Sequence, residues 1–390
     1  MFLSKISLSN KAILIGMAFV VLIVLGLSQL YLNKATYDWH WQLPDGFPEP
    51  FVPVDNPMSE VKFQLGRHLF YDKRLSGNGT MACASCHLQH LAFTDGRDKS
   101  IGSTGEKTDR GAMSLVNVAY FPTLTWANPS LTLLERQAMV PLFTDNLPVE
   151  MGIDQSNQNE VLRRITQDTL YQRMFKDAFP EVTLLDFSHI IKAIATFERG
   201  MISANAKFDK VRRGEDSFTP IETTGKTLFY GKAQCAQCHS GLNFSDQFYA
   251  KELPYINWPF HNTGLYNIDG KGAYPSDNQG LVAVIPGDRN MGKFRTQALR
   301  NIALTAPYMH DGSIATLEEV LDHYARHGRA VSKGDNQGDG KLSPLKDPIL
   351  DKVEITEEDK PALIAFLKTL TDESLLTNPR FSDPFIIQQK

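Results

Sequence analysis

The sequence predicts a mainly α fold, with two helical domains preceded by an N-terminal transmembrane anchor. Three observations lead to this prediction. The chain has 390 residues, which is enough for two domains that each bury a core. Apolar residues recur at helical spacing, and there are few strand signals. A long uncharged run opens the chain, and a short sequence repeat links its two halves.

The opening run has no charged residue from Ala12 to Asn33, which is long enough to span a bilayer as a helix. Lys5 and Lys11 precede it, so the positive-inside rule keeps the N-terminus in the cytoplasm and places the chain after Lys34 in the periplasm. No clear cleavage site follows the run. We therefore expect an inner-membrane anchor over residues 1–35, with a cleaved signal peptide as the alternative.

Residues 36–58 are rich in proline and aromatic side chains and are expected to form an extended tether. Helical patterns begin at Ser59, which precedes apolar residues at helical spacing. A second helix is expected between the cap Asp186 and the stop signal Gly200. A third is expected near the C-terminus, with Thr356 as its cap.

The internal repeat pairs GRHLFYD at residues 66–72 with GKTLFYG at residues 225–231. Each copy precedes a cysteine motif, and a second short pair, FTD and FSD, follows the two motifs. This arrangement indicates two related domains. A polar connector near Glu215 separates them, which predicts domains over residues 59–214 and 215–390.

All four cysteines fall into two Cys-x-x-Cys-His motifs. This pattern attaches haem c: the thiols add to the porphyrin vinyl groups, and the histidine becomes the proximal iron ligand. Zinc, a redox dithiol and disulfides are the alternatives, but a dithiol does not require histidine at the next position twice. We therefore expect two covalently bound haem c groups. The residues are Cys83, Cys86, His87, Cys235, Cys238 and His239.

The charge distribution says little about partners. Charged residues make up 22% of the chain, and the formal net charge is −4. There is no basic stripe of the kind that binds nucleic acid. We therefore expect no nucleic-acid partner.

Three longer segments surround the haem motifs: LFYDKRLSGNGTMACASCH, ERQAMVPLFTDNLPVEMG and ALRNIALTAPYMHDGS. Through them the chain, from about Met58 to its C-terminus, resembles the bacterial di-haem cytochrome c peroxidase and MauG superfamily. The resemblance is strongest to the MbnH-type enzymes, which are associated with methanobactin. It implies two cytochrome c-like domains, with a peroxide-binding haem in the N-terminal one (haem one) and an electron-transfer haem in the C-terminal one (haem two).

The resemblance assigns a catalytic pocket above haem one to Gln137, Pro141 and Glu150. Splitting peroxide requires a group that moves a proton between its two oxygens, and the buried carboxyl of Glu150 would do so. Gln137 would hold peroxide or water by hydrogen bonding, and Pro141 would exclude bulk water. The segment before Glu150 is longer than in the family.

Two positions depart from the peroxidases. The histidine that blocks iron in many of them corresponds to Ser103, a poor iron ligand, so haem one is expected to be open at rest, as in MauG. The outer iron ligand of haem two corresponds to Tyr324, with His323 and Met309 as alternatives. A phenolate stabilises high oxidation states of iron, whereas the methionine of the peroxidases raises the potential.

Trp126 resembles the family's tryptophan between the haems and is expected to relay electrons, with an ordinary core aromatic as the alternative. Many members also bind a calcium ion through backbone oxygens that match Thr305 and Pro307. The family's asparagine ligand is Gly111 here. That replacement weakens the prediction of calcium.

The resemblance thus implies a periplasmic enzyme that uses hydrogen peroxide to form a high-valent di-haem state and oxidises a partner protein at a side chain, a tryptophan. One alternative is a cytochrome-c peroxidase that removes peroxide with electrons from a small electron-transfer protein. The other is a di-haem electron carrier with no enzymatic site. Gln137 with Glu150 argues against the carrier, and Tyr324 argues against the peroxidase.

Overall fold

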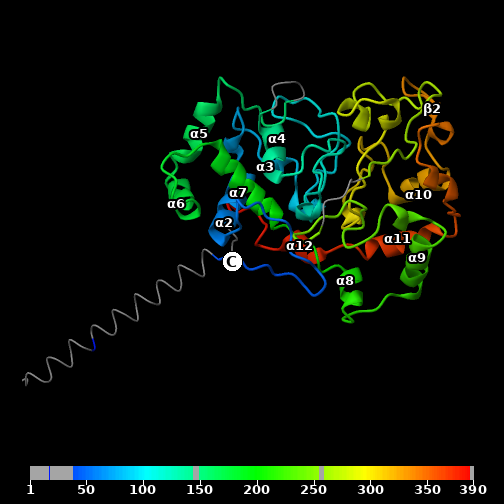
Figure 1. The fold of residues 1–390 in the computed structure, drawn as a ribbon, viewed down its shortest axis with the longest axis horizontal. Helices are drawn as coiled ribbons and strands as arrows, with labels where there is room; N and C mark the ends of the chain where they lie inside the picture. Colours follow the sequence, from blue (N-terminus) through cyan, green and yellow to red (C-terminus); the bar gives the residue numbers. More distant parts are fainter. Residues whose placement is uncertain (1–16, 18–37, 144–148, 254–258, 387–390) are drawn as a thin grey trace, which may run out of the picture.

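The computed structural model describes residues 17, 38–143, 149–253 and 259–386, and its regular secondary structure is mostly helical (Figure 1). Strands β1 (Ala330–Val331) and β2 (Gly338–Asp339) form a small antiparallel pair. The α-helices are α2 (Glu60–Tyr71), α3 (Leu134–Gln137), α4 (Met139–Phe143), α5 (Gln158–Thr166), α6 (Thr169–Ala178), α7 (Phe187–Arg199), α8 (Lys207–Arg212), α9 (Pro220–Tyr230), α10 (Leu317–Ala325), α11 (Lys360–Lys368) and α12 (Glu373–Thr377).

The predicted fold class needs one correction, which concerns the transmembrane anchor. Within the part of the chain that the structure describes, no helix combines the length and the apolar character that crossing a membrane requires. Apart from Met17, the predicted anchor over residues 1–35 lies outside that part. The described residues therefore show the mostly helical, cytochrome c-like part of the predicted fold.

The first hydrophobic core forms where α2 crosses α7. Ser59 begins α2 by accepting the backbone N–H of Lys62 at 3.3 Å, and Asp186 caps α7, both as predicted. The two helices approach so closely that a Cβ on Gly66 would lie 1.9 Å from the carbonyl oxygen of Ala193. A side chain at this position would force the helices apart.

The second core repeats this crossing with α9 and α11. Here a Cβ on Gly225 would lie 1.8 Å from the carbonyl oxygen of Ala362. Phe229 of α9 packs against Phe366 of α11, with the ring centroids 5.2 Å apart. The glycine of the sequence repeat therefore has the same packing role in both halves, which gives the repeat a physical reason.

The C-terminal helix begins later than the sequence suggests. Its N-cap is Asp359, and α11 runs from Lys360. Thr356 lies a turn earlier, and its N–H and hydroxyl both donate to the Asp359 carboxylate, at 2.9 and 3.1 Å. Pro361 explains the shift, because proline has no N–H to donate and fits the first turn of a helix.

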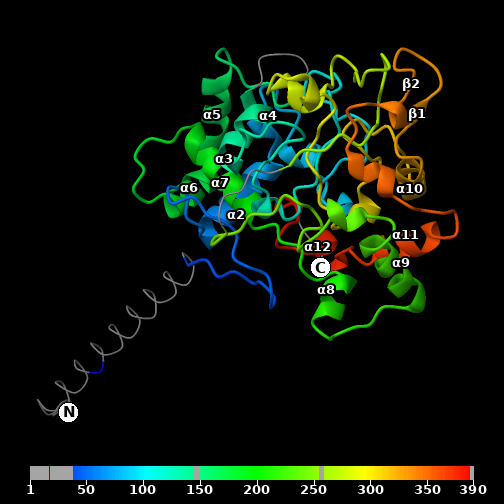
Figure 2. The ribbon, with the colours of Figure 1, turned by 45° about the vertical axis from the view of Figure 1, so that its right-hand side comes forward.

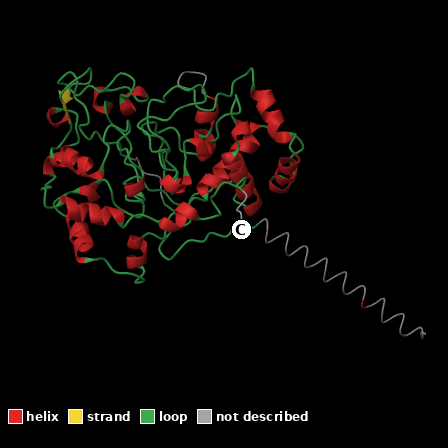
Figure 3. Cartoon of the chain, turned by 180° about the vertical axis from the view of Figure 1, so that it is seen from behind, coloured by secondary structure: helices red, strands yellow, loops and turns green. Residues whose placement is uncertain are grey.

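Long irregular segments separate the helices (Figures 2 and 3), and both ends of the described body contact distant parts of the chain. At the C-terminal end, Phe381 belongs to the first core and accepts a hydrogen bond from the Tyr71 hydroxyl at 2.7 Å. At the N-terminal end, Trp39 packs on Phe63 of the first core, and Glu49 accepts the N–H of Lys251 at 3.0 Å. The domain boundary at Glu215 stays a prediction.

Candidate functional site

In each haem motif a backbone carbonyl fixes the ring of the histidine. The 3₁₀ turn η2 (Cys83–Ser85) precedes His87, whose Nδ1 lies 2.8 Å from the carbonyl oxygen of Phe93. In the second motif, Nδ1 of His239 lies 3.1 Å from the carbonyl oxygen of Phe244. Because Nδ1 donates in such a bond, Nε2 keeps its lone pair for a metal. Both histidines therefore present the nitrogen that a haem iron needs.

Burial lowers the pKa of both His87 and His239, and the neutral imidazole is the form that binds iron. The two accepting residues also share an unusual backbone: φ is 61° at Phe93 and 51° at Phe244. Bulky residues adopt this left-handed conformation only where the surroundings impose it. This shared turn explains why FTD and FSD recur after the two motifs.

The second motif lines a cavity of about 270 Å³. Cys235, Cys238 and His239 lie in its wall together with Tyr324 and apolar side chains of the second core. Such a mainly apolar pocket with a few polar groups suits a cofactor. The two sulfurs and the imidazole in the wall are the groups that attach haem c.

Arg295 indicates that a negatively charged group belongs in this cavity. Its side chain lines the cavity and is only 5% exposed, and it bonds to the carbonyl of Thr123 and the amide oxygen of Gln297. Its Nε has no hydrogen-bond partner in the described part of the molecule. Burial lowers the pKa of Arg295 to about 9, and a buried uncompensated charge is costly. A haem propionate would supply the missing negative charge, so the residues present fit haem.

The structure places the three residues predicted for the haem-one pocket in one region. Gln137 ends α3, and Pro141 follows one turn later in α4. Met151 donates its N–H to the Pro141 carbonyl at 2.9 Å, which brings Glu150 beside this helix. Burial raises the pKa of Glu150, and the charge of Glu150 adds to the larger effect of burial in raising the pKa of the free Cys86 thiol. Glu150 thus lies near the first haem motif, and its catalytic role stays a prediction.

Ser103 is tied to the same region by its backbone. Its N–H donates to the carbonyl of Glu150 at 2.8 Å, and its carbonyl accepts from Nδ2 of Asn78 at 2.8 Å. Ser103 also lines a second pocket of about 460 Å³, with Asn78 and Asn157. Much of the longer segment before Glu150, residues 144–148, lies outside the described residues.

The three candidate outer ligands of haem two differ in position. Tyr324, on α10, lines the cavity, and burial raises its pKa. Met309 lines the same cavity. His323 is absent from the described lining; burial lowers its pKa to about 4, and neither ring nitrogen has a hydrogen-bond partner among the described residues. Tyr324 and Met309 are therefore better placed than His323.

Trp126 lies in the wall of the same cavity. Its Nε1 donates to the Gly111 carbonyl at 3.1 Å, and its own carbonyl accepts the N–H of Arg295 at 2.8 Å. Thr305, Pro307 and Gly111 also line this cavity. The positions predicted for the electron relay and for the calcium site thus line one cavity, while both roles stay predictions.

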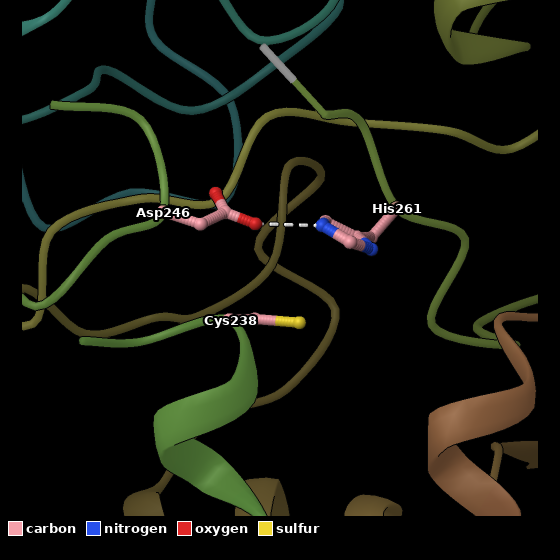
Figure 4. A group of neighbouring side chains, drawn as sticks. All are labelled: Cys238, Asp246 and His261. Carbon is pink, nitrogen blue, oxygen red and sulfur yellow. Dashed lines mark hydrogen bonds and ion pairs between the residues drawn. The ribbon is translucent and has the colours of Figure 1, made fainter.

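His261 lies between two carboxylates, an arrangement that sequence reasoning missed. Its Nε2 is 2.7 Å from Oδ2 of Asp246 (Figure 4). Its Nδ1 is 2.6 Å from Oδ2 of Asp347. Burial lowers the pKa of His261, but hydrogen bonds to both aspartates and the nearby Cys238 sulfur outweigh it and raise the pKa to about 11.

The Cys238 sulfur lies within 4.8 Å of the ligand atoms of Asp246 and His261, a grouping that could otherwise hold a metal ion. Because this sulfur is needed for haem attachment, we interpret the group as a structural clamp beside haem two. Only Asp246 has a signal in the sequence, since it belongs to the FSD copy of the repeat.

Comparisons with known proteins agree with the geometry. The family model described as di-haem cytochrome c peroxidase matches residues 60–217. The cytochrome-c peroxidase IdrP1 of Pseudomonas sp. (strain SCT) is 34% identical, over 90% of this chain and 91% of that protein. The methylamine utilization protein MauG of Methylorubrum extorquens is 30% identical, over 85% of this chain and 83% of that protein.

A solved structure gives a closer match. It is the crystal structure of a MauG-like protein associated with microbial copper homeostasis, which is 54% identical with a TM-score of 0.88. The match covers 90% of this chain and 100% of that one. The chain therefore belongs to the di-haem cytochrome c peroxidase and MauG family and is a peroxide-dependent oxidoreductase with two haem c groups.

Proposed function

We propose that the enzyme uses hydrogen peroxide to oxidise a side chain of a partner protein, and that this side chain is a tryptophan. The observation that carries the proposal is the position of Tyr324 in the cavity wall, beside Cys235, Cys238 and His239. A phenolate ligand stabilises high oxidation states of iron. It therefore suits storage of oxidising equivalents better than rapid uptake of electrons from a cytochrome.

On the haem-one side, the haem supplies the iron at which peroxide is reduced. The chain's own residues would prepare the peroxide for this reaction. Burial raises the pKa of Glu150, which suits a carboxyl that holds a proton and passes it between the two peroxide oxygens. The Gln137 amide would orient the peroxide by hydrogen bonding, Pro141 would exclude bulk water, and Ser103 would leave the iron accessible.

Trp126 would relay electrons between the two haem sites. The cavity wall that contains it also includes Thr94 and Asp95, which follow the first haem motif, as well as Cys235 of the second. An indole is among the most easily oxidised side chains. An electron that moves between the two sites would therefore meet a suitable group at Trp126.

We place the enzyme in the periplasm, where haem c is attached. We further propose that its partner takes part in copper handling, because the similar solved structure is described as associated with microbial copper homeostasis. A calcium ion near Thr305 and Pro307 would complete the site. Metal analysis of the purified holoprotein tests that last point.

A second candidate function is that of a cytochrome-c peroxidase. Met309 lines the same cavity as Tyr324, and a thioether ligand would favour electron uptake from a cytochrome. One relative is also named a cytochrome-c peroxidase. A carrier with no enzymatic site does not fit membership of this enzyme family.

One experiment separates the two functions. Peroxide is added to the holoenzyme with either reduced cytochrome c or a candidate copper-binding partner, and cytochrome absorbance and partner mass are followed. We expect a change in partner mass and little cytochrome turnover, with a peroxide-free reaction as the control. The Tyr324→Met variant should move activity toward the cytochrome. Fast cytochrome oxidation by the unaltered enzyme, with no change in partner mass, would contradict this proposal and favour the cytochrome-c peroxidase function.

A further inference from the structure

A series of aromatic rings runs from Trp126, through His310 in the same cavity wall, to two tyrosines that do not belong to the described lining. The ring of His310 lies 6.4 Å from Trp126, centroid to centroid, and 6.3 Å from Tyr274. Tyr274 in turn lies 5.4 Å from Tyr266. Phe294 stacks on His310 at 3.7 Å and holds this ring in place. The predicted electron relay is therefore connected to two tyrosines through one imidazole.

The hydrogen bonds of these rings differ in a way that matters for oxidation. A phenol or an indole that loses an electron becomes strongly acidic and is stabilised only where a base can take its proton. The Nε1 of Trp126 donates to a backbone carbonyl, and the Tyr274 hydroxyl donates to the amide oxygen of Asn262 at 2.8 Å. Neither acceptor is a base. The Tyr266 hydroxyl donates to the carboxylate of Asp311 at 2.7 Å, so Tyr266 is the ring in this series with a proton acceptor.

The surroundings of Tyr266 suit this role. The Asp311 carboxylate is held in place for this contact, because its other oxygen, Oδ1, accepts the backbone N–H of Ser313 at 3.1 Å. Tyr266 is 7% exposed and lies beneath the guanidinium of Arg329, which is 5.8 Å from the ring centroid. The phenol is thus shielded, while Asp311 is only half-buried and can pass the proton to solvent.

We propose that Tyr266 is a redox-active tyrosine that stores one oxidising equivalent derived from peroxide. One electron leaves the Tyr266 ring and, by way of Tyr274 and His310, fills the vacancy that the peroxide reaction creates at Trp126. The phenolic proton moves to the Asp311 carboxylate in the same event. The products are a neutral phenoxyl radical at Tyr266, a protonated Asp311 and a restored Trp126. The oxidant is hydrogen peroxide, which the enzyme's own activity consumes.

The storage of an oxidising equivalent at Tyr266 is a function separate from the proposed oxidation of a partner protein. An oxidising equivalent that meets no partner protein would be stored at Tyr266, which is covered by Arg329 and does not belong to the described cavity lining. The storage of this equivalent depends on the peroxide reaction of the family. It does not depend on which protein, if any, is oxidised.

The test is to react the holoenzyme with peroxide in the absence of a partner, freeze the mixture rapidly and record electron paramagnetic resonance spectra. Protein grown with ring-deuterated tyrosine identifies a tyrosine radical, because deuteration narrows its signal. We expect such a signal in the unaltered enzyme and its loss in Tyr266→Phe. Asp311→Asn keeps a hydrogen-bond acceptor but removes the base, so it should also suppress the signal.

Tyr120→Phe is the matched control, because Tyr120 is a fully buried tyrosine whose hydroxyl donates to the Pro48 carbonyl. Its ring contacts among the described residues are with Phe47 and Phe248, not with the series that begins at Trp126. This variant should keep the full signal. An unchanged signal in Tyr266→Phe would overturn the proposal, and so would the absence of any tyrosine signal in unaltered enzyme that has consumed peroxide. Partner mass, measured separately, reports on the proposed function: a radical at Tyr266 with no change in partner mass would leave this inference standing and reject the partner reaction.

Discussion

Replacing Glu198 by glutamine should make the enzyme more stable at neutral pH. Glu198 is 6% exposed, next to the end of α7, and its Oε2 has no hydrogen-bond partner among the described residues. Burial raises its pKa from 4.5 to about 8; the charge of Glu135 adds to the rise, and that of Arg199 opposes it. The folded protein therefore holds a proton here that the unfolded chain releases at neutral pH.

The size of the effect follows from linkage. A group whose pKa is raised by folding contributes stability that is present below its unfolded pKa and is lost as pH rises toward its folded pKa. Between pH 4.5 and pH 8 the wild type should therefore lose about 1.4 kcal/mol per pH unit from Glu198 alone. Glutamine stays neutral, so the advantage of Glu198→Gln should grow by about 3 kcal/mol from pH 4.5 to pH 7.

Urea unfolding of the holoenzyme at several pH values measures this difference, with the midpoints converted to free energies through the slope m. Glu181→Gln is the control, because Glu181 is an exposed carboxyl in the same half of the chain. Its stability curve should run parallel to that of the wild type. If the Glu198→Gln curve is parallel as well, Glu198 is not held neutral by burial and the reasoning fails.

Four further predictions concern the haem sites. Glu150→Gln should slow the stopped-flow reaction with peroxide by about 100- to 10,000-fold, because it removes the proton-transfer group; an unchanged rate would assign proton transfer to another residue. Ser103→His should convert ferric haem one from high spin to low spin and make peroxide binding depend on prior reduction, whereas a spectrum that stays high spin would show that this position does not face the iron. Tyr324→Phe should alter the low-spin ferric signal of haem two and shorten the life of the oxidised state, while an unaltered signal would move the ligand to Met309. Trp126→Phe should slow electron passage between the haems, followed by rapid-mixing spectroscopy, without changing the resting spectrum; equal rates would exclude Trp126 as the relay.

Local sequence signals predicted the parts of the fold that local chemistry controls. Ser59 and Asp186 cap the helices that they were expected to cap, because a short polar side chain satisfies free N–H groups wherever a helix begins. The prediction that Thr356 caps the C-terminal helix is wrong. Pro361 lies in the first turn of α11, so the helix begins at Lys360 and Asp359 is its N-cap. The sequence repeat shows that Gly66 and Gly225 correspond to each other. It does not show why glycine is required, because each glycine packs against a helix that is far away along the chain.

The candidate site also has parts that the sequence predicts and parts that it does not. The haem motifs are contiguous, so the sequence displays them in full, and the repeat FTD and FSD marks the carbonyls that orient the two histidines. The clamp around His261 joins Asp246 and Asp347, which are 15 and 86 residues away along the chain. No local sequence pattern predicts contacts between residues that are so far apart along the chain. The Tyr266 pair with Asp311, 45 residues apart, escapes sequence reasoning for the same reason.

These features also show where function can diverge within the family. The bonds that orient the proximal histidines and the buried charge of Arg295 suit haem binding, and haem is common to peroxidases and to enzymes that oxidise proteins. They cannot distinguish the two activities. The distinction must come from groups on the open side of each iron, and the positions that we propose for this chain are Ser103 and Tyr324. A single replacement at either one should therefore alter the reaction while leaving the scaffold folded, which makes this pair the most direct route for converting one activity into the other.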